Sequence, residues 1–320
     1  MASPPRAASD LSTQLAAAEE AYLRLAVPGL PIERCETTSG PLRLHYLTCG
    51  QGEPMLLLHG RGSSAARFAP ILAQLAAERR VLALDLPGWG LSDKPPFTGR
   101  RAADALKVWV EGVRTLLDDQ GIERVDLLGH SMGGFTALGF ALDAPERVGR
   151  LVLVDPGGVG TQMQLDARLF FSLGPERLYR RFGKRLVRFI YARETAQLPA
   201  MHAADPAAAE AEIEFLYRLA TQHGIVESGA RAFNAWINLN GVHLDLGERL
   251  SELPMPVLLL WGMRDRVTPY ANALHAVRHL RDGKLVTFVR CGHAPFAERP
   301  DDFIRVLLAW LAGIHVPSRA

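Results

Sequence analysis

Cysteine is scarce in this sequence, and neither sign of charge is in excess. The three cysteines, Cys35, Cys49 and Cys291, include no Cys-x-x-Cys pair, so we expect reduced, packed thiols rather than a disulfide framework. The chain has 36 Lys and Arg residues against 34 Asp and Glu residues, a formal net charge of +2. This balance gives no reason to expect nucleic acid as a partner.

Long apolar runs and metal-ligand spacings are also missing. No stretch approaches the roughly 20 apolar residues that a membrane-spanning helix needs, so we expect no stable membrane insertion. The first residues contain a Pro pair and no apolar segment typical of a secretion signal, which favours a cytoplasmic protein. His275 and His279 lie four residues apart without an acidic or histidine companion nearby. We therefore expect no metal and no cofactor.

The remaining residues show a regular order of elements. Residues 1–10 are expected to be disordered, and Leu11–Leu25 has the apolar spacing of a helix. Ile32–Thr37 and Leu42–Thr48 predict a hairpin. Short apolar strands then alternate with amphipathic helices. The strands are Met55–Leu58, Val81–Leu84, Val125–Leu128, Leu151–Val154, Val257–Trp261 and Leu285–Val289; the helices are Ala65–Leu75, Ala102–Leu117, Phe135–Leu142, Ala271–Leu280 and Asp302–Leu311.

This alternation predicts an α/β fold with a mostly parallel eight-stranded sheet and helices on both faces. It is interrupted between Gly157 and Leu253, where helical stretches with aromatic residues contain no convincing buried strand. An insertion at that place predicts a helical lid over the strand ends. The expected parts are an N-terminal tail and helix (1–30), the first part of the core (31–156), the lid (157–253) and the second part of the core (254–320).

One turn indicates chemistry. The apolar run Leu127-Leu128 leads into Gly129-His130-Ser131-Met132-Gly133, typical of a strand that turns sharply into a helix. The two glycines allow strand and helix to approach closely, which leaves the hydroxyl of Ser131 exposed beside helix-start N–H groups. Taken alone, the motif is equally compatible with Ser131 as an ordinary helix N-cap.

A serine nucleophile needs a base and a group that orients the base, and two later loops supply both. Asp265 follows the strand that ends at Trp261, and His293 follows Val286–Arg290. The chain order Ser, Asp, His is the order that such a sheet requires. Asp265 is alternatively a helix N-cap, and Asp155, after Val154, is a second candidate acid whose place before Pro-Gly-Gly favours turn chemistry.

These motifs together make the chain resemble the α/β-hydrolase superfamily from about Arg43 to Leu311. The residues that carry the resemblance are His59-Gly60, Asp85-Leu86-Pro87-Gly88-Trp89-Gly90-Leu91-Ser92, the turn around Ser131, Trp261-Gly262-x-x-Asp265-x-x-x-Pro269 and Gly292-His293. The resemblance implies a serine hydrolase with a helical lid, esterase- or lipase-like and related to meta-cleavage product hydrolases. It implies Ser131 as nucleophile, His293 as general base and then acid, and Asp265 as the residue that orients His293.

The oxyanion hole is expected from the backbone N–H groups of Arg61 and Met132. We expect the side chain of Arg61 to lie in solvent, with contact to an anionic substrate group as the alternative. His59 is interpreted as a brace for the oxyanion loop, and His130 is expected to point away from the nucleophile.

The nucleophile and the insertion together suggest a substrate class. Relatives that use an aspartate or a cysteine in place of Ser131 are disfavoured, which leaves a carboxylic-ester hydrolase acting on small to medium apolar esters as the main hypothesis. Its apolar pocket is predicted from the aromatic residues Phe170, Phe171, Phe215, Tyr217, Phe233 and Trp236.

Three further possibilities stay open. Carbon–carbon hydrolases of ring-fission products (vinylogous diketones) share the Ser-Met-Gly-Gly pattern, but they usually carry Asn and Trp where this chain has His130 and Ala294. A non-catalytic ligand-binding protein of the same fold is the second alternative, and a homo-oligomer is compatible with the sequence.

The predicted lid contains a basic helix. Its residues are Arg177, Arg180, Arg181, Lys184, Arg185 and Arg188, with Leu178, Phe182 and Phe189 at helical spacing. We interpret it as a solvated face whose apolar stripe packs inward. Attachment to an anionic membrane surface or an acidic partner is the alternative.

Overall fold

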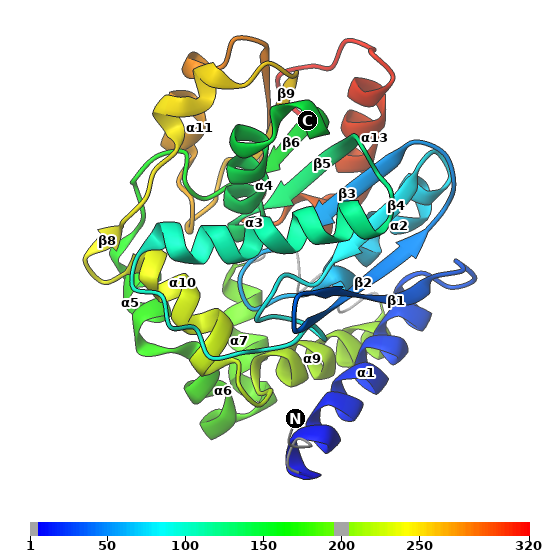
Figure 1. Ribbon diagram of the computed structural model, residues 1–320, viewed down its shortest axis with the longest axis vertical. Coiled ribbons are helices and arrows are strands. Elements are labelled where there is room, and N and C mark those ends of the chain that lie inside the picture. Colours follow the sequence, from blue (N-terminus) through cyan, green and yellow to red (C-terminus); the bar gives the residue numbers. More distant parts are fainter. Residues whose placement is uncertain (1–5, 195–204) are drawn as a thin grey trace.

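A single eight-stranded sheet forms the centre of the protein, in the order β1-β2-β4-β3-β5-β6-β9-β10 (Figure 1). The structure is a computed structural model that describes residues 6–194 and 205–320. β2 pairs antiparallel with β1 and β4, and all other neighbours are parallel. The strands are β1 (Glu33–Ser39), β2 (Leu42–Cys49), β3 (Pro54–Leu58), β4 (Arg80–Leu84), β5 (Val125–His130), β6 (Val148–Val154), β9 (Val257–Gly262) and β10 (Gly283–Phe288). The predicted fold class is confirmed.

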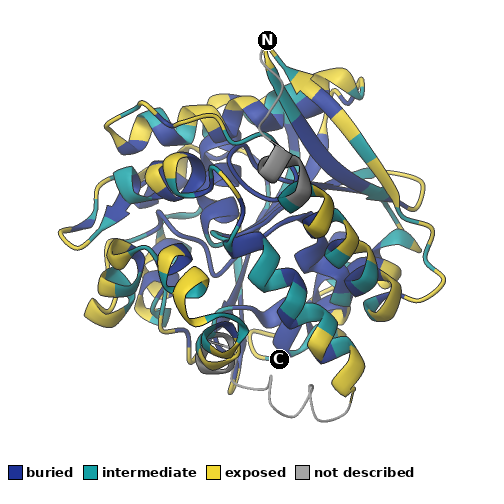
Figure 2. Ribbon diagram, turned by 90° about the horizontal axis from the view of Figure 1, so that it is seen from below, coloured by how far each residue is buried: buried dark blue, intermediate teal, exposed yellow. Residues whose placement is uncertain are grey.

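Two apolar cores cover the two faces of this sheet. Leu56 and Leu58 of β3 belong to the core beneath α3 and α4, whereas Met55 and Leu57 belong to the core beneath α2 and α13. Neighbouring residues of one strand are thus buried on opposite faces, which explains the uninterrupted apolar runs. Figure 2 shows these buried strands between helices whose outer sides are exposed. The helices outside the segment between β6 and β9 are α1 (Arg6–Ala26), α2 (Ala69–Ala76), α3 (Ala102–Asp119), α4 (Met132–Asp143), α11 (Tyr270–His279), α12 (Pro295–Glu298) and α13 (Pro300–Leu311), with short helical turns at Ala65–Phe68 and Pro145–Arg147. Two further short helical turns, Val226–Ala230 and Gly247–Glu252, belong to that segment.

The segment between β6 and β9, here called the insert, is mainly helical. In Figure 1 the helices α5, α6, α7 and α9 gather below the sheet. The ribbon β7–β8 is separate from the large sheet. The insert contains α5 (Leu165–Leu173), α6 (Pro175–Phe182), α7 (Lys184–Glu194), α9 (Pro206–Ala220), α10 (Arg231–Trp236), β7 (Ile237–Asn238) and β8 (Gly241–Val242). Its exact limits, 157 and 253, and those of the other predicted parts stay predictions.

Two local expectations are wrong. The first helix begins at Arg6, so residues 6–10 are helical rather than disordered; they contain two alanines, Ala7 and Ala8, which favour helix extension. The basic segment forms two helices, because Gly183 adopts a φ of 66° between α6 and α7. Val187 of α7 is buried, whereas Phe182 at the end of α6 and Phe189 of α7 are 57% and 66% exposed instead of packing inward.

Helix α1 packs against both the insert and the core. Leu15 and Leu23 are buried, and the ring of Tyr22 stacks on Phe215 of α9 with centroids 5.2 Å apart. Within the described part of the chain, no helix combines the length and apolar character needed to cross a bilayer.

Candidate active site

Ser131 lies at the tip of a strained turn between β5 and α4. Its φ of 54° and ψ of −115° are unusual for a residue with a side chain. A Cβ on Gly129 would be 2.3 Å from the carbonyl oxygen of Gly133, and one on Gly133 would be 2.1 Å from that of Leu58. Only glycine fits at either position, because three backbone segments meet there. Ser131 makes no side-chain hydrogen bond to the start of α4, so it does not act as an ordinary N-cap.

Three distant loops meet at this turn. His293 Nε2 lies 2.9 Å from Ser131 Oγ, and His293 Nδ1 lies 2.7 Å from Asp265 Oδ2. The carboxylate oxygen of Asp265 accepts the hydrogen on Nδ1, which leaves Nε2 to accept the hydroxyl hydrogen of Ser131. The structure therefore brings together the three residues that the sequence predicts.

Backbone donors hold the carboxylate of Asp265 in place. Its Oδ1 accepts hydrogen bonds from the N–H groups of Val267 and Thr268, at 2.7 and 3.0 Å. The hydroxyl of Thr268 donates to Oδ2 at 2.6 Å. The N-cap of α11 is Pro269, so the N-cap interpretation of Asp265 does not describe this arrangement.

Asp155 is a second buried carboxyl group next to this site. Its Oδ1 accepts the N–H of Gly262 at 2.9 Å. One of its carboxyl oxygens lies within 4.8 Å of a carboxyl oxygen of Asp265 and of a ring nitrogen of His293. Burial and the negative charge of Asp265 raise the pKa of Asp155 well above its ordinary value. Burial thus favours the neutral form of Asp155, and Asp265 is the carboxyl group that faces the imidazole.

His130 does not point away from the site, contrary to the sequence expectation. Its Nε2 donates to the backbone oxygen of His293 at 2.7 Å, and the two rings lie 4.9 Å apart. The ring also contacts Phe296 edge-on, with centroids 5.0 Å apart, and His130 lines the same cavity as Ser131. Burial and the neighbouring His293 lower the pKa of His130 well below its ordinary value, so the ring is neutral.

The loop after β3 lies against the serine. A Cβ on Gly60 would be 3.2 Å from Ser131 Cβ. His59 braces this loop, because its ring nitrogens bond to the Gly60 carbonyl at 2.7 Å and the Leu86 N–H at 3.0 Å. Met132 is the first residue of α4, where an N–H group has no acceptor within the helix.

The side chain of Arg61 is buried, so the expectation that it lies in solvent is wrong. Its side chain is 7% exposed, and Nη2 lies 2.7 Å from Oε1 of Glu176 on α6. The guanidinium is 5.1–5.7 Å from three ring centroids, those of Trp89, Phe171 and Phe233. Two of these rings and Glu176 belong to the insert. The sequence around Arg61 carries no local pattern that indicates where the insert packs.

A cavity of about 160 Å³ opens between this loop, the serine and the insert. Of the six aromatic residues predicted to form an apolar pocket, only Phe170 and Phe171 line it. Phe215 instead packs on α1, and Trp236 stacks on Phe135. Other residues of its wall are Gly60, Arg61, Arg67, His130, Ser131, Glu176, Tyr179, Val187, Leu216, Ala220, His293 and Ala294.

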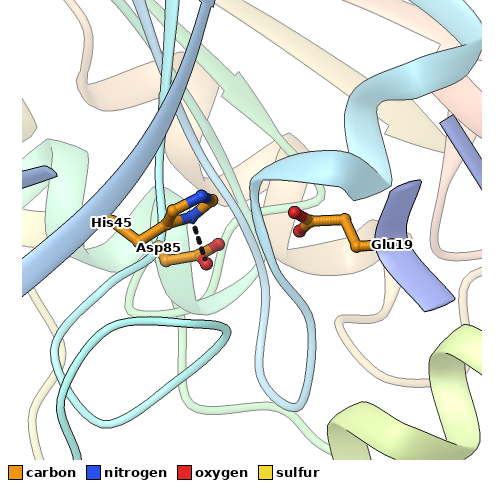
Figure 3. A group of neighbouring side chains, drawn as sticks. All are labelled: Glu19, His45 and Asp85. Carbon is orange, nitrogen blue, oxygen red and sulfur yellow. Dashed lines mark hydrogen bonds and ion pairs between the residues drawn. The ribbon is translucent and has the colours of Figure 1, made fainter. Parts of the chain in front are cut away.

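A second buried polar cluster lies away from this cavity, beneath α1 (Figure 3). His45 Nδ1 is 3.0 Å from Asp85 Oδ2, and Glu19 points at this pair from α1. Burial and the charge of Asp85 raise the pKa of Glu19 to about 7. Both oxygens of Asp85 already accept backbone N–H groups, from Ala65 at 2.6 Å and Leu91 at 2.7 Å, so the donor set fits a structural hydrogen-bond network better than a metal ion.

Comparison with known proteins agrees with this fold. A family model described as the alpha/beta hydrolase fold matches residues 53–300. A 2-hydroxy-6-oxononadienedioate/2-hydroxy-6-oxononatrienedioate hydrolase of Burkholderia vietnamiensis strain G4 is 34% identical over 282 residues, covering 84% of this chain and 91% of the relative. A 2-hydroxy-6-oxo-6-phenylhexa-2,4-dienoate hydrolase of Comamonas testosteroni is 30% identical over 277 residues, with the same coverages. The crystal structure of a membrane phospholipase A, described as a bacterial virulence factor, has a TM-score of 0.74 at 27% identity and covers 95% of this chain and 92% of its own.

Proposed function

Because the chain belongs to the α/β-hydrolase fold family, we propose that it is a serine hydrolase that cleaves a carbon–carbon bond beside a carbonyl group in an oxo-dienoate. The names of the two similar hydrolases from Comamonas testosteroni and Burkholderia vietnamiensis contain compounds of that kind. The observation that supports hydrolysis through a serine is the 2.9 Å contact between Ser131 Oγ and His293 Nε2. This proposal reverses the order expected from the sequence, in which an ester was the main substrate.

The first half of the reaction forms an acyl-enzyme. Ser131 Oγ attacks the substrate carbonyl carbon while His293 Nε2 takes its proton. Asp265 stabilises the imidazolium through Nδ1. The N–H groups of Arg61 and Met132 are proposed to donate to the oxyanion, and loss of one such donor typically costs about 3 kcal/mol of transition-state stabilisation.

Collapse of the tetrahedral intermediate then breaks the carbon–carbon bond. For this step the dienol must first isomerise to its 2-oxo form, in which the proton of the 2-hydroxyl group has moved to C5. The electron pair of the C5–C6 bond then passes into the conjugated 2-oxo group as a dienolate, and the imidazolium of His293 returns the proton to it. Water attacks the ester carbonyl on Ser131 with His293 again as base, which releases a carboxylic acid. We interpret the insert as the lid that covers this site, since its helices α5, α6, α7 and α9 supply cavity residues.

The two departures from the carbon–carbon hydrolase pattern, His130 and Ala294, both line the cavity. Neither is part of the Ser131–His293–Asp265 contact chain. We infer that they change the fit of the substrate and leave the attack by Ser131 in place. A small Ala294 beside His293 leaves room that a larger side chain would occupy.

Ester hydrolysis is the second candidate. It is supported by the 27% identity to a phospholipase and by a cavity wall rich in apolar side chains. The acyl-enzyme would be the same, and only the leaving group would differ: an alcohol oxygen in place of a carbon.

The two candidates are distinguished by assaying 2-hydroxy-6-oxo-6-phenylhexa-2,4-dienoate and p-nitrophenyl butyrate side by side. We expect the dienoate to have the larger kcat/KM, and Ser131→Ala to lower kcat by about 10⁴-fold or more. Ser251→Ala, an exposed position outside the site, is the matched control.

Turnover of the ester alone would support the second candidate. Tight binding of either compound without turnover would support the non-catalytic alternative. Undiminished turnover by Ser131→Ala would reject both hydrolytic mechanisms.

A further inference from the structure

The ion pair between Arg61 and Glu176 is a polar feature in a mainly apolar cavity wall. Both side chains line the cavity, and they are 7% and 3% exposed. Arg61 directly follows Gly60, which lies against Ser131. The pair is therefore next to the position where a substrate carbonyl must sit for attack.

Both charged groups have unused hydrogen-bonding capacity. Among the described residues, Arg61 Nε and Nη2 and Glu176 Oε2 make no hydrogen bond, although all three atoms are buried. The 2.7 Å approach of Nη2 to Glu176 Oε1 supplies charge contact without hydrogen-bond geometry. Leaving a buried polar atom unpaired is energetically unfavourable. A ligand group that accepts from the guanidinium would recover this energy.

The guanidinium is held in place for such a ligand. Three aromatic rings surround the guanidinium, each with its centroid within 5.7 Å. Phe171 and Phe233 belong to the insert, and Trp89 belongs to the core. The other cation in the cavity wall, Arg67, is already engaged by Glu212 of α9 at 3.0 Å. Arg61 is thus the better placed of the two cations to take a new anionic partner.

We propose that Arg61 determines substrate specificity by binding a carboxylate carried by the substrate, with Glu176 keeping the guanidinium turned toward the cavity. A planar guanidinium binds a carboxylate through two parallel hydrogen bonds. Glu176 also repels an anion, so it limits the affinity of the site. This inference rests on the proposed function only in taking the cavity as the substrate site.

Binding to a variant that does not turn over separates this inference from the hydrolytic mechanism. Ser131→Ala is titrated calorimetrically with mono-p-nitrophenyl glutarate and with its methyl ester, which differ by one negative charge. We expect the acid to bind about 10-fold or more tightly than the methyl ester. Equal affinity for the two ligands would overturn the proposal, whatever Ser131→Ala does to turnover.

Substitutions at the pair assign the preference to its residues. In the Ser131→Ala background, Arg61→Met should remove the preference for the acid, and Arg61→Lys should keep part of it. Glu176→Gln should increase the preference, because the competing negative charge is gone. If the ion pair is purely structural, Glu176→Gln should instead weaken the binding of both ligands and leave the preference for the acid no larger.

A matched control and a fold control complete the test. Arg67→Met removes the other cation of the wall and should leave the ratio of the two affinities near that of the parent. Removing one partner of a buried pair destabilises a protein, so Arg61→Met/Glu176→Leu removes both charges together. This double variant should fold and bind both ligands equally. A retained preference in the folded double variant would overturn the role of Arg61.

Discussion

Two aspartates lie close to His293, and their surroundings differ. Asp265 accepts hydrogen bonds from two backbone N–H groups and from the Thr268 hydroxyl. Asp155 is buried beside that charge with a single N–H donor, from Gly262. Burial beside Asp265 therefore raises the pKa of Asp155 and favours its neutral form.

Neutralising each aspartate should give different results. We expect Asp265→Asn to lower kcat by about 10⁴-fold, because the amide favours the wrong tautomer of His293. Asp155→Asn replaces an acid whose neutral form is favoured by burial with a neutral group of similar shape, and asparagine tolerates the φ of 40° at this position. It should keep most of the activity. The measurement is kcat of both variants on the better substrate; a larger loss for Asp155→Asn would contradict this assignment.

At the scale of single elements, α1 carries a buried acid into the core. Glu19 lies beside Asp85 and His45 and accepts a hydrogen bond from Arg34 of β1 at 3.1 Å. Its pKa rises from an ordinary 4.5 to about 7, so the folded protein binds this proton more tightly than the unfolded chain. The contribution to stability is complete below pH 4.5 and is lost as the pH rises toward 7.

Glu19→Gln should remove that pH dependence. Above pH 7 the free energy of unfolding of the variant is expected to exceed that of the parent by up to about 3 kcal/mol, which is the energy equivalent of the pKa difference. Loss of the ionic contact with Arg34 reduces this gain. The check is the free energy of urea unfolding at pH 5 and pH 8. Glu20→Gln, on the exposed side of the same helix, should change neither value.

How far the sequence predicts each element depends on whether its signal is local. Ser131, Asp265 and His293 were identifiable because each lies in a loop directly after an apolar strand, and the chain order specified which loops meet. The side chain of Arg61 was misplaced because its partners, Glu176 and Phe233, come from elements far along the chain. The prediction of one continuous basic helix is wrong at a single residue, Gly183. The residues on both sides of it have helical spacing, so the sequence pattern does not indicate that its backbone breaks the helix.

At the scale of the whole molecule, α1 lies outside the residues matched by the family model but supports the cavity. Tyr22 packs on Phe215 of α9, and Leu216 and Ala220 of the same helix line the cavity. The position of this wall thus depends on an element at the opposite end of the chain from His293.

Removing residues 2–30 should therefore weaken both stability and substrate binding. We expect Tm to fall by more than about 5 °C, because several buried apolar side chains of α1 are lost, and KM to rise more than kcat falls. A variant lacking only residues 2–10 keeps Leu15 and Tyr22 and is the control. A truncation that alters neither Tm nor KM would show that α9 holds its place without α1.

The turn at Ser131 has a consequence for evolution of this chain. A side chain at φ 54° stores on the order of 1–3 kcal/mol, and a glycine there would release it. Substitutions that relieve this strain would also remove the proposed nucleophile, so stability and reactivity compete at this position as the sequence changes.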